Sequence, residues 1–395
     1  MNGLPSLNYE FLAPRIVFGW GRRKEAGILA RGLGRRAFVV CGAQALIDSG
    51  MMAELLSALR SGGVTPELAD TISHEPEVAD VDQLAARLRQ QKAGAGDLVL
   101  AVGGGAAIDL GKAVAAMATN DAGASVRDYL ENVGRGLTIV NDPLPVLAMP
   151  TTAGTGAEAT RNAVISCYDP PFKKSLRDTR ILPRIALVDP ELTVSVPPDV
   201  TAASGMDAIT QLFESFLSRK AQPIPQALAL HGLTLAMPAI VEAVRNGACR
   251  HARERMAHAA LLSGIALANS GLGMAHGVAA ALGVHDRVPH GLACAVLLPV
   301  ALRANRSVCQ AALAQMAHAV LPQSQFLSTE EAAEAFIREI ERLCDAVGVP
   351  RRLSQLGVRR DQIPQLVADS RGSSMSGNPR ELADAELAQM LEEVL

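Results

Sequence analysis

The pattern of apolar residues changes character about half-way along this chain of 395 residues. Before residue 196, short apolar runs of strand length alternate with segments of helical spacing. Beyond it, strand signals vanish and long Ala/Leu-rich helical periods follow, with the proline-rich stretch SVPPD between the two regimes. Strands that alternate with helices are typical of a parallel sheet covered on both faces. The sequence therefore predicts an α/β domain over residues 1–196 and an all-helical domain over residues 197–395.

The individual elements follow from their periods and from glycine and proline breaks. The predicted strands cover residues 36–41, 97–102, 144–149 and 185–188. The predicted helices of the first half cover residues 51–60, 81–91 and 106–118. Those of the second half cover residues 205–218, 226–245, 250–270, 299–304, 308–320 and 329–347. Ligand pockets favour the seam between two such domains, so a binding site is expected there.

Composition argues against several classes of partner. The net charge is −3 and aromatic residues make up 3% of the chain, so neither a phosphate-tracking surface nor a base-stacking platform for nucleic acid is expected. The six cysteines form no CxxC pair and are predicted to be free thiols in a reducing compartment. The sequence shows no signal-peptide pattern and no apolar run of about 18 residues. We therefore expect a cytoplasmic protein that binds no membrane.

A run of three glycines, Gly103, Gly104 and Gly105, joins a predicted strand to a predicted helix. Glycine lets the backbone approach a pyrophosphate closely, and a helix N-terminus offers amide donors and the positive end of its dipole. The run does not match the GxGxxG pattern, and a tight turn without a ligand explains it equally well. Taken alone, it leaves a nucleotide site and a plain turn as open alternatives.

Three threonines, Thr151, Thr152 and Thr155, lie in the segment PTTAGTGAE that directly follows a predicted strand. Loops at the carboxyl ends of strands are where α/β folds place ligands, and these residues offer hydroxyls and amides among small neighbours. The alternative is a polar connection in which Thr155 caps the next turn. The segment alone does not decide between the two interpretations.

Four polar residues of the second half form a candidate metal-binding set. Asp207 and Gln211 are four residues apart on a predicted helix and so share a face. His276 and His290 each precede a glycine, which leaves room beside the imidazole. One carboxylate with two imidazoles suits Zn²⁺ or Fe²⁺. The alternative is that each histidine is an ordinary surface or core residue, as we expect for the other six.

Together these motifs resemble the iron-containing (group III) alcohol dehydrogenase family. The glycine run is followed by Asp109 and Lys112 as in the family, and the threonine segment matches PTTAGTGSE except at Ala157. The segments DPELT and GMDA and the two His-Gly pairs follow in the family's order and spacing. The similarity extends from residue 14 to residue 380. It implies a Rossmann-like nucleotide-binding domain followed by an all-α domain, the dehydroquinate synthase-like fold.

The resemblance also assigns roles to residues of this chain. The implied cofactor-binding residues are Gly103, Gly104, Gly105, Asp109, Thr151, Thr152, Thr155 and Lys173. The glycines would hold the pyrophosphate, and the threonines would line the nicotinamide end. The implied metal ligands, which are also the expected catalytic residues, are Asp207, His276 and His290, with Gln211 as a candidate fourth ligand.

Two positions depart from the family's pattern. Gln211 stands where the commonest second metal ligand is a histidine, and an amide oxygen is a weaker ligand than imidazole for a borderline-soft metal. Gln211 is therefore expected to be either a weak ligand or a hydrogen-bonding neighbour of the metal site. Ala280 stands where the family often carries a histidine, so a proton relay through that position is absent or replaced.

The resemblance implies an NAD- or NADP-linked oxidoreductase that needs Fe²⁺ or Zn²⁺ and acts on a small alcohol, aldehyde or ketone. The metal would polarise the substrate oxygen while the nicotinamide exchanges a hydride. A homodimer or larger homo-oligomer is expected. Three alternatives stay open: a maleylacetate reductase, a non-redox relative of dehydroquinate synthase, and a catalytically idle homologue. Asp207 argues against the first of these, because such enzymes tend to lack the metal-binding aspartate.

The choice between NAD and NADP depends on the residues after the strand at 36–41. NAD-preferring members of the family often carry an aspartate there, which binds the ribose hydroxyls and repels a 2′-phosphate. Here the corresponding positions are Gly42 and Ala43, which carry no charge. The sequence therefore predicts that NADPH is accepted or preferred.

Overall fold

A six-stranded parallel sheet forms the framework of the first half of the protein, which is known here from a computed structural model that describes residues 8–42 and 44–395. The strands lie in the order β1-β8-β5-β4-β2-β3, and every neighbouring pair is parallel. Their bounds are β1 Arg15–Phe18, β2 Arg36–Gly42, β3 Thr65–Ile72, β4 Asp97–Gly103, β5 Val146–Pro150 and β8 Ile185–Val188. The predicted parallel sheet is therefore confirmed.

Helices cover both faces of this sheet. The helices of the first half are α1 Ala26–Arg31, α2 Gln44–Asp48, α3 Met51–Ser61, α4 Val78–Gln90 and α5 Gly105–Met117. In β2, Phe38 and Val40 belong to the apolar cluster shared with α4 and α5, whereas Ala37 and Val39 belong to the cluster shared with α1 and α3. Because successive side chains point to opposite faces and both are buried, the central strands read as continuous apolar runs. That is why β2, β4, β5 and β8 could be predicted.

The two edge strands, β1 and β3, were not predicted. Each has one unpaired edge, and both carry exposed residues among buried ones. Pro66 lies within β3, which an edge strand tolerates because one row of backbone amides needs no partner in the sheet. The apolar signal of a strand weakens where only part of the strand is covered.

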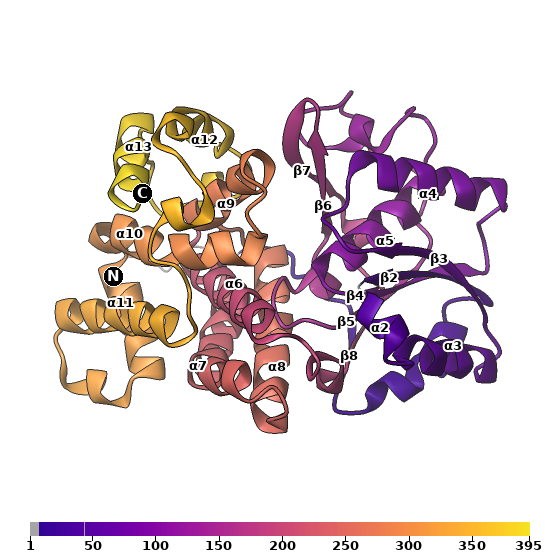
Figure 1. Ribbon diagram of the computed structural model, residues 1–395, viewed down its shortest axis with the longest axis horizontal. Helices are drawn as coiled ribbons and strands as arrows, with labels where there is room; N and C mark the ends of the chain where they lie inside the picture. The colour runs from indigo at the N-terminus through magenta and orange to yellow at the C-terminus, as the bar shows by residue number, and fades with distance from the viewer. Residues whose placement is uncertain (1–7, 43) are drawn as a thin grey trace.

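An antiparallel hairpin of β6 (Asn162–Tyr168) and β7 (Pro171–Arg177) stands apart from the main sheet. Figure 1 shows it between the α/β lobe, drawn in indigo to magenta, and the helical lobe, drawn in pink to yellow. It packs against α5 on one side and α9 on the other. The hairpin was not predicted either, since β7 alternates weakly and carries several charged residues.

The second half is helical, and the described residues after β8 contain no strand. Its helices are α6 Pro198–Leu217, α7 Pro223–Arg245, α8 Arg250–Asn269, α9 Met274–His285, α10 His290–Val320, α11 Thr329–Ala346, α12 Ile363–Asp369 and α13 Asp384–Glu393. Short 3₁₀ turns connect many of the elements of both halves. The predicted division at residue 196 falls in the connection between β8 and α6.

The prediction of two separate helices over residues 299–304 and 308–320 was wrong, because α10 is one helix that begins at His290. Pro299 lies inside it and removes one helical hydrogen bond. Its neighbours Leu298, Ala301 and Leu302 are fully buried, so packing holds the backbone helical through the proline. The helix α9 was also missed.

Two helices, α7 and α10, are long and apolar enough to cross a membrane by length and composition alone, and the bent pair of α8 and α9 would add a third span. Within the protein, 44% of the apolar stretch of α7 and 61% of that of α10 is buried. In this fold α10 packs against α6, α9 and α11. The absence of a membrane partner stays a prediction.

Candidate active site

A cavity of about 480 Å³ lies at the seam between the two halves. The α/β half contributes the start of α5, the end of the threonine segment and the β6–β7 hairpin, and the helical half contributes α8, α9 and the segment after α12. Gly105 and Thr155 lie on its walls together with His276 and His290. The cavity therefore joins the predicted cofactor residues to the predicted metal ligands, at the kind of domain seam where ligands bind.

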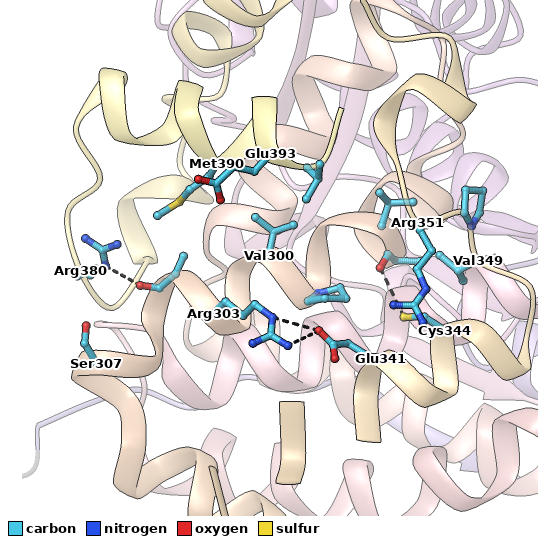
Figure 2. Close-up of a pocket in the computed structure, with 16 residues that line it drawn as sticks. Val300, Arg303, Ser307, Glu341, Cys344, Val349, Arg351, Arg380, Met390 and Glu393 are labelled. Atoms are coloured by element: carbon cyan, nitrogen blue, oxygen red, sulfur yellow. Dashed lines mark hydrogen bonds and ion pairs between the residues drawn. The ribbon is translucent and has the colours of Figure 1, made fainter. Parts of the chain in front are cut away.

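A second cavity of about 450 Å³ lies within the helical half, between α10, α11 and α13, and Figure 2 shows its lining. It contains none of the predicted cofactor or metal residues, and each of its guanidinium groups pairs with a carboxylate. The pairs are Arg303–Glu341, Arg351–Asp345 and Arg380–Glu386. Because the guanidinium groups of this second cavity are already paired and it holds none of the predicted residues, the seam cavity is the stronger candidate for chemistry.

Three helices bring four potential metal ligands together beside the seam cavity. Asp207 comes from α6, His276 from α9, and His290 and Cys294 from the first two turns of α10. One ligand atom from each lies within 4.8 Å of those of the others. Among the described residues this is the one such group of His, Cys, Asp and Glu side chains. The structure thus assembles the three predicted ligands and adds Cys294, which sequence reasoning missed.

The unpartnered atoms of this group point to a bound cation. His276 Nε2 lies 3.2 Å from Asp207 Oδ1, and His290 Nε2 lies 4.0 Å from the same oxygen. Asp207 Oδ1 and His276 Nε2 are buried, yet neither has a hydrogen-bond partner in the part of the chain that the structure describes. Buried polar atoms are rarely left unsatisfied without a reason such as an absent ion. A carboxylate, two imidazoles and a thiol suit a divalent cation such as Zn²⁺ or Fe²⁺.

Glu214 fixes the orientation of His276. One carboxylate oxygen of Glu214 lies 2.7 Å from His276 Nδ1, and the other accepts a hydrogen bond of 2.7 Å from the backbone N–H of Ala275. Glu214 is seven residues after Asp207, so both project from one face of α6. A carboxylate that holds the far nitrogen of a metal-binding histidine is a recurrent feature of metal sites. Sequence reasoning missed Glu214, although its spacing from Asp207 was a usable signal.

Gln211 lies on the same face of α6, where its side chain forms hydrogen bonds with Ser263 and Asp207. Its side-chain oxygen accepts a hydrogen bond of 2.8 Å from Ser263 Oγ on α8. Its amide nitrogen donates to Asp207 Oδ2 at 3.4 Å. In this arrangement Gln211 supports the second carboxylate oxygen of Asp207. A direct role as metal ligand stays a prediction.

The electrostatics of the group favour the metal-binding forms of Asp207 and His290 but not those of the other two members. Burial alone would raise the pKa of Asp207, but the neighbouring His276 and His290 side chains hold that pKa below its usual value. Burial and the nearby charge of Lys173 lower the pKa of His290 to about 4. At neutral pH, Asp207 is therefore ionised and His290 is neutral, with a lone pair available.

Burial raises the pKa of the Cys294 thiol to about 12. Against the opposing effect of burial, interactions with Cys294, Asp207 and Glu214 raise the pKa of His276 well above its usual value.

The glycine turn leaves no room for side chains at the start of α5. Gly103 has a φ of +153°, and a Cβ there would lie 2.7 Å from Gly42 Cα. A Cβ on Gly105 would lie 2.8 Å from the side chain of Thr155. The backbone N–H of Thr151 donates to the Gly103 carbonyl at 2.9 Å and ties the threonine segment to the turn. The turn thus exposes a helix N-terminus that suits a pyrophosphate.

The eight predicted cofactor residues divide into two groups. Those that line the cavity are Gly105, Asp109, Thr155 and Lys173. Those that do not line it are Gly103, Gly104, Thr151 and Thr152. Thr152 lies beside the turn, since a Cβ on Gly104 would lie 3.5 Å from its hydroxyl. Contact of these residues with a cofactor stays a prediction.

Asp109 and Lys173 already have ionic partners. Asp109 pairs with the fully buried Lys112 at 2.8 Å and accepts a hydrogen bond of 3.0 Å from the backbone N–H of Val164, so it anchors the hairpin to α5. Lys173 on β7 pairs with Glu75 at 2.6 Å. Asp109 and Lys173 therefore line the cavity and also hold neighbouring segments of its lining in place.

Arg161 is a further cavity residue that sequence reasoning missed. It follows the threonine segment, lines the cavity, and has a buried Nε without a hydrogen-bond partner. Among the described residues it forms no ion pair. Its guanidinium group is thus available to a ligand with acceptor atoms.

Comparison with known proteins identifies the family. The model of the iron-containing alcohol dehydrogenases matches residues 13–190, and that of the C-terminal domain of Fe-containing alcohol dehydrogenases matches residues 201–395. The chain belongs to the iron-containing alcohol dehydrogenase family. This confirms the predicted family, the predicted fold class and the prediction of an enzyme of the alcohol dehydrogenase type.

Other members of the family are similar over nearly their whole length. The chain is 34% identical to long-chain-alcohol dehydrogenase 1 of Geobacillus thermodenitrificans, with 96% of both sequences covered. The crystal structure of a 1,3-propanediol oxidoreductase superposes with a TM-score of 0.91 at 31% identity, with 98% of this chain and 100% of that one covered. Sulfoacetaldehyde reductase from Bifidobacterium kashiwanohense, solved with NAD⁺, gives 0.86 at 31% identity, with 98% and 99% covered.

Glu158, which ends the threonine segment, is expected to make stability depend on pH. It is 2% exposed, and burial raises the pKa of its carboxyl group from 4.5 to about 7 against the opposing effect of Lys112. The unfolded chain releases this proton above pH 4.5 and the folded chain only above about pH 7, so stability falls as pH rises through that window. On going from pH 4.5 to about pH 8, Glu158→Gln should gain about 3 kcal/mol of unfolding free energy relative to wild type.

Denaturant unfolding at both pH values measures this difference. Glu242→Gln, at an exposed position of α7, is the matched control and should leave the pH dependence unchanged. The same pH dependence in Glu158→Gln and wild type would show that this carboxyl group titrates normally.

Proposed function

We propose that this enzyme interconverts a small alcohol and its aldehyde or ketone in the seam cavity. The observation that carries the proposal is the arrangement of that cavity, which is lined by the N-terminus of α5 and by His276 and His290, with Asp207 of the same metal group directly behind them. The helix N-terminus suits the pyrophosphate of NAD or NADP, and the metal group suits Fe²⁺ or Zn²⁺. Both partners of a hydride transfer would then meet across one space.

The residues of the chain prepare this space for the reaction. Glu214 holds His276 with its Nε2 toward Asp207, and Gln211 supports the other oxygen of Asp207. When bound, a divalent cation supplies Lewis acidity that polarises the oxygen of the substrate. A bound nicotinamide supplies or accepts the hydride.

Proton transfer has to follow a route that does not use Ala280. This residue lines the cavity at the position where the family often carries a histidine, and a methyl group carries no proton. The proton that an alcohol releases on oxidation therefore leaves through other cavity groups or solvent. The seam cavity is partly open to solvent at its polar side, where Ser373 and Ser374 lie.

An alcohol and aldehyde panel tests the proposal directly. Apo protein is reconstituted separately with Fe²⁺ and Zn²⁺ and assayed with NADH, NADPH and the oxidised cofactors. Turnover of at least one alcohol–aldehyde pair that requires metal is the expected result. Absence of hydride transfer with every combination would favour the idle homologue, and metal-independent reduction of maleylacetate would favour the maleylacetate reductase.

NADPH is expected to serve at least as well as NADH. Gly42 carries no carboxylate, and a Cβ there would lie 2.9 Å from Ala107 Cβ and 3.1 Å from Gly103 Cα, so the glycine turn leaves no room for one. Nothing at this position repels a 2′-phosphate. Ala43, the second position of the prediction, lies outside the described residues. The ratio of kcat/KM for the two cofactors measures the preference, and a strong preference for NADH would contradict the prediction.

We further propose a cytoplasmic homodimer or larger homo-oligomer. The edge strand β1 supports association, because among the described residues it pairs only with β8 and its Ile16 is 41% exposed. An unpaired edge with an exposed apolar side chain favours contact with another chain. Sedimentation equilibrium measures the oligomeric state, and a monomer at micromolar concentration would contradict this proposal.

A further inference from the structure

Cys294 belongs to the apolar core of the helical half and, in addition, lies within the metal group. It is fully buried on α10, one helical turn after His290, and its Sγ lies 3.7 Å from His290 Nε2. The same Sγ lies within 4.8 Å of the ligand atoms of Asp207 and His276. Its neighbours on that side are thus polar atoms, two of which have no hydrogen-bond partner.

The helix geometry explains how the sulfur reaches this place. His290 is the first residue of α10, and residues four apart in a helix lie one above the other on the same face. A Cβ on the intervening Gly291 would lie 2.6 Å from the carbonyl oxygen of Ala203 on α6. This close approach of α10 to α6 brings both His290 and Cys294 to Asp207.

Gln211 presents its amide nitrogen, and not its oxygen, to Asp207 in the metal group. Its side-chain oxygen, which is the atom that could bind a cation, accepts a hydrogen bond of 2.8 Å from Ser263. Its amide nitrogen faces Asp207 and can donate but not coordinate. The group therefore contains three recognised donors and one soft donor, the sulfur of Cys294.

We propose that Cys294 is the fourth protein ligand of the metal, as a thiolate, and that Gln211 supports Asp207 without binding the metal. The inference rests on the proposed function, since it assumes that Asp207, His276 and His290 hold a divalent cation. The thiol proton leaves to solvent as the cation binds. His276 and His290 line the cavity whereas Asp207 and Cys294 lie behind its wall, so the substrate side of the cation stays accessible.

The donor set has a consequence for metal choice. A thiolate is a soft ligand and favours zinc, whereas a site of carboxylate and imidazole donors alone serves zinc and iron more evenly. The centre of this chain is thus a zinc site of Asp-His-His-Cys type within a family named for iron. Metal competition between Zn²⁺ and Fe²⁺ on the apo protein should favour Zn²⁺.

Cobalt substitution tests the sulfur ligand by a readout other than activity. Apo protein is titrated with Co²⁺, and a thiolate bound to Co²⁺ gives a charge-transfer band in the near ultraviolet that nitrogen and oxygen donors do not give. We expect one Co²⁺ per chain with this band in wild type. Cys294→Ser should lose the band and weaken Zn²⁺ binding by more than about tenfold. Cys309→Ser, at a buried cysteine further along α10, is the control and should keep both.

A double variant separates loss of a ligand from loss of folding. Cys294→Ala with Gln211→His replaces sulfur by imidazole on the neighbouring helix, so Zn²⁺ binding should recover while the charge-transfer band stays absent. Stoichiometric Co²⁺ without the band in wild type would overturn the sulfur ligand and leave the proposed function standing. Absence of Co²⁺ and Zn²⁺ binding in wild type would overturn both.

Discussion

Replacement of His276 by alanine is expected to remove the bound metal and to lower kcat/KM by more than about 100-fold, beyond the usual effect of losing an outer partner of a metal site. His276 Nε2 is one of the unpartnered atoms that face Asp207, and its other nitrogen is held by Glu214. No residue of α9 can take its place, because His276 is flanked there only by apolar residues and glycine. Elemental analysis and steady-state kinetics measure the two effects.

The control for this variant has to separate chemistry from folding. His276→Ala leaves the carboxylates of Asp207 and Glu214 buried without their shared partner, which is costly. His276→Gln keeps a polar side chain between them and should fold if the alanine variant does not. His318→Ala, at the far end of α10, should keep metal and activity. Full activity in His276→Gln without metal would show that the metal group is not the reaction centre.

The sequence predicted the centre of the fold better than its edges. The four central strands β2, β4, β5 and β8 are buried on both faces and therefore have strong apolar runs. The edge strands β1 and β3 and the hairpin β6–β7 lack that signal, because the packing that stabilises them comes from residues distant in the sequence. Propensity alone does not register such tertiary support.

At the candidate site, too, some residues were predicted from the sequence and others were missed. The family resemblance identified Asp207, His276 and His290, which are brought together by three different helices. Cys294 and Glu214 were missed for a local reason. The predicted helix begins only at residue 299, whereas α10 begins at His290, so the four-residue spacing of His290 and Cys294 lay outside any predicted helix. On α6, the prediction used the helical spacing that places Asp207 and Gln211 on one face. It did not extend that spacing by a further turn, which reaches Glu214.

Glu214→Gln is expected to weaken Zn²⁺ binding by about 10–100-fold, the usual effect of losing a carboxylate that orients a metal-binding histidine. The reason lies in the two hydrogen bonds of Glu214. An amide whose oxygen keeps the bond from the Ala275 backbone N–H presents its NH₂ group to His276 Nδ1. That nitrogen must then accept, which places the ring proton on Nε2, the atom needed for the metal. An amide turned the other way leaves the Ala275 N–H buried and facing a second donor.

Titration calorimetry on the apo protein measures this loss, and the kinetic constants show whether it is specific. Because Glu214 touches neither cofactor residues nor substrate space, KM for the nicotinamide cofactor should stay within about twofold while the metal dependence of kcat moves to higher concentration. Glu254→Gln on α8, which loses only a partly exposed pair with Arg250, is the control and should leave Zn²⁺ binding unchanged. Unchanged affinity in Glu214→Gln would mean that His276 does not bind through Nε2, and the orientation of the whole group would have to be reassigned.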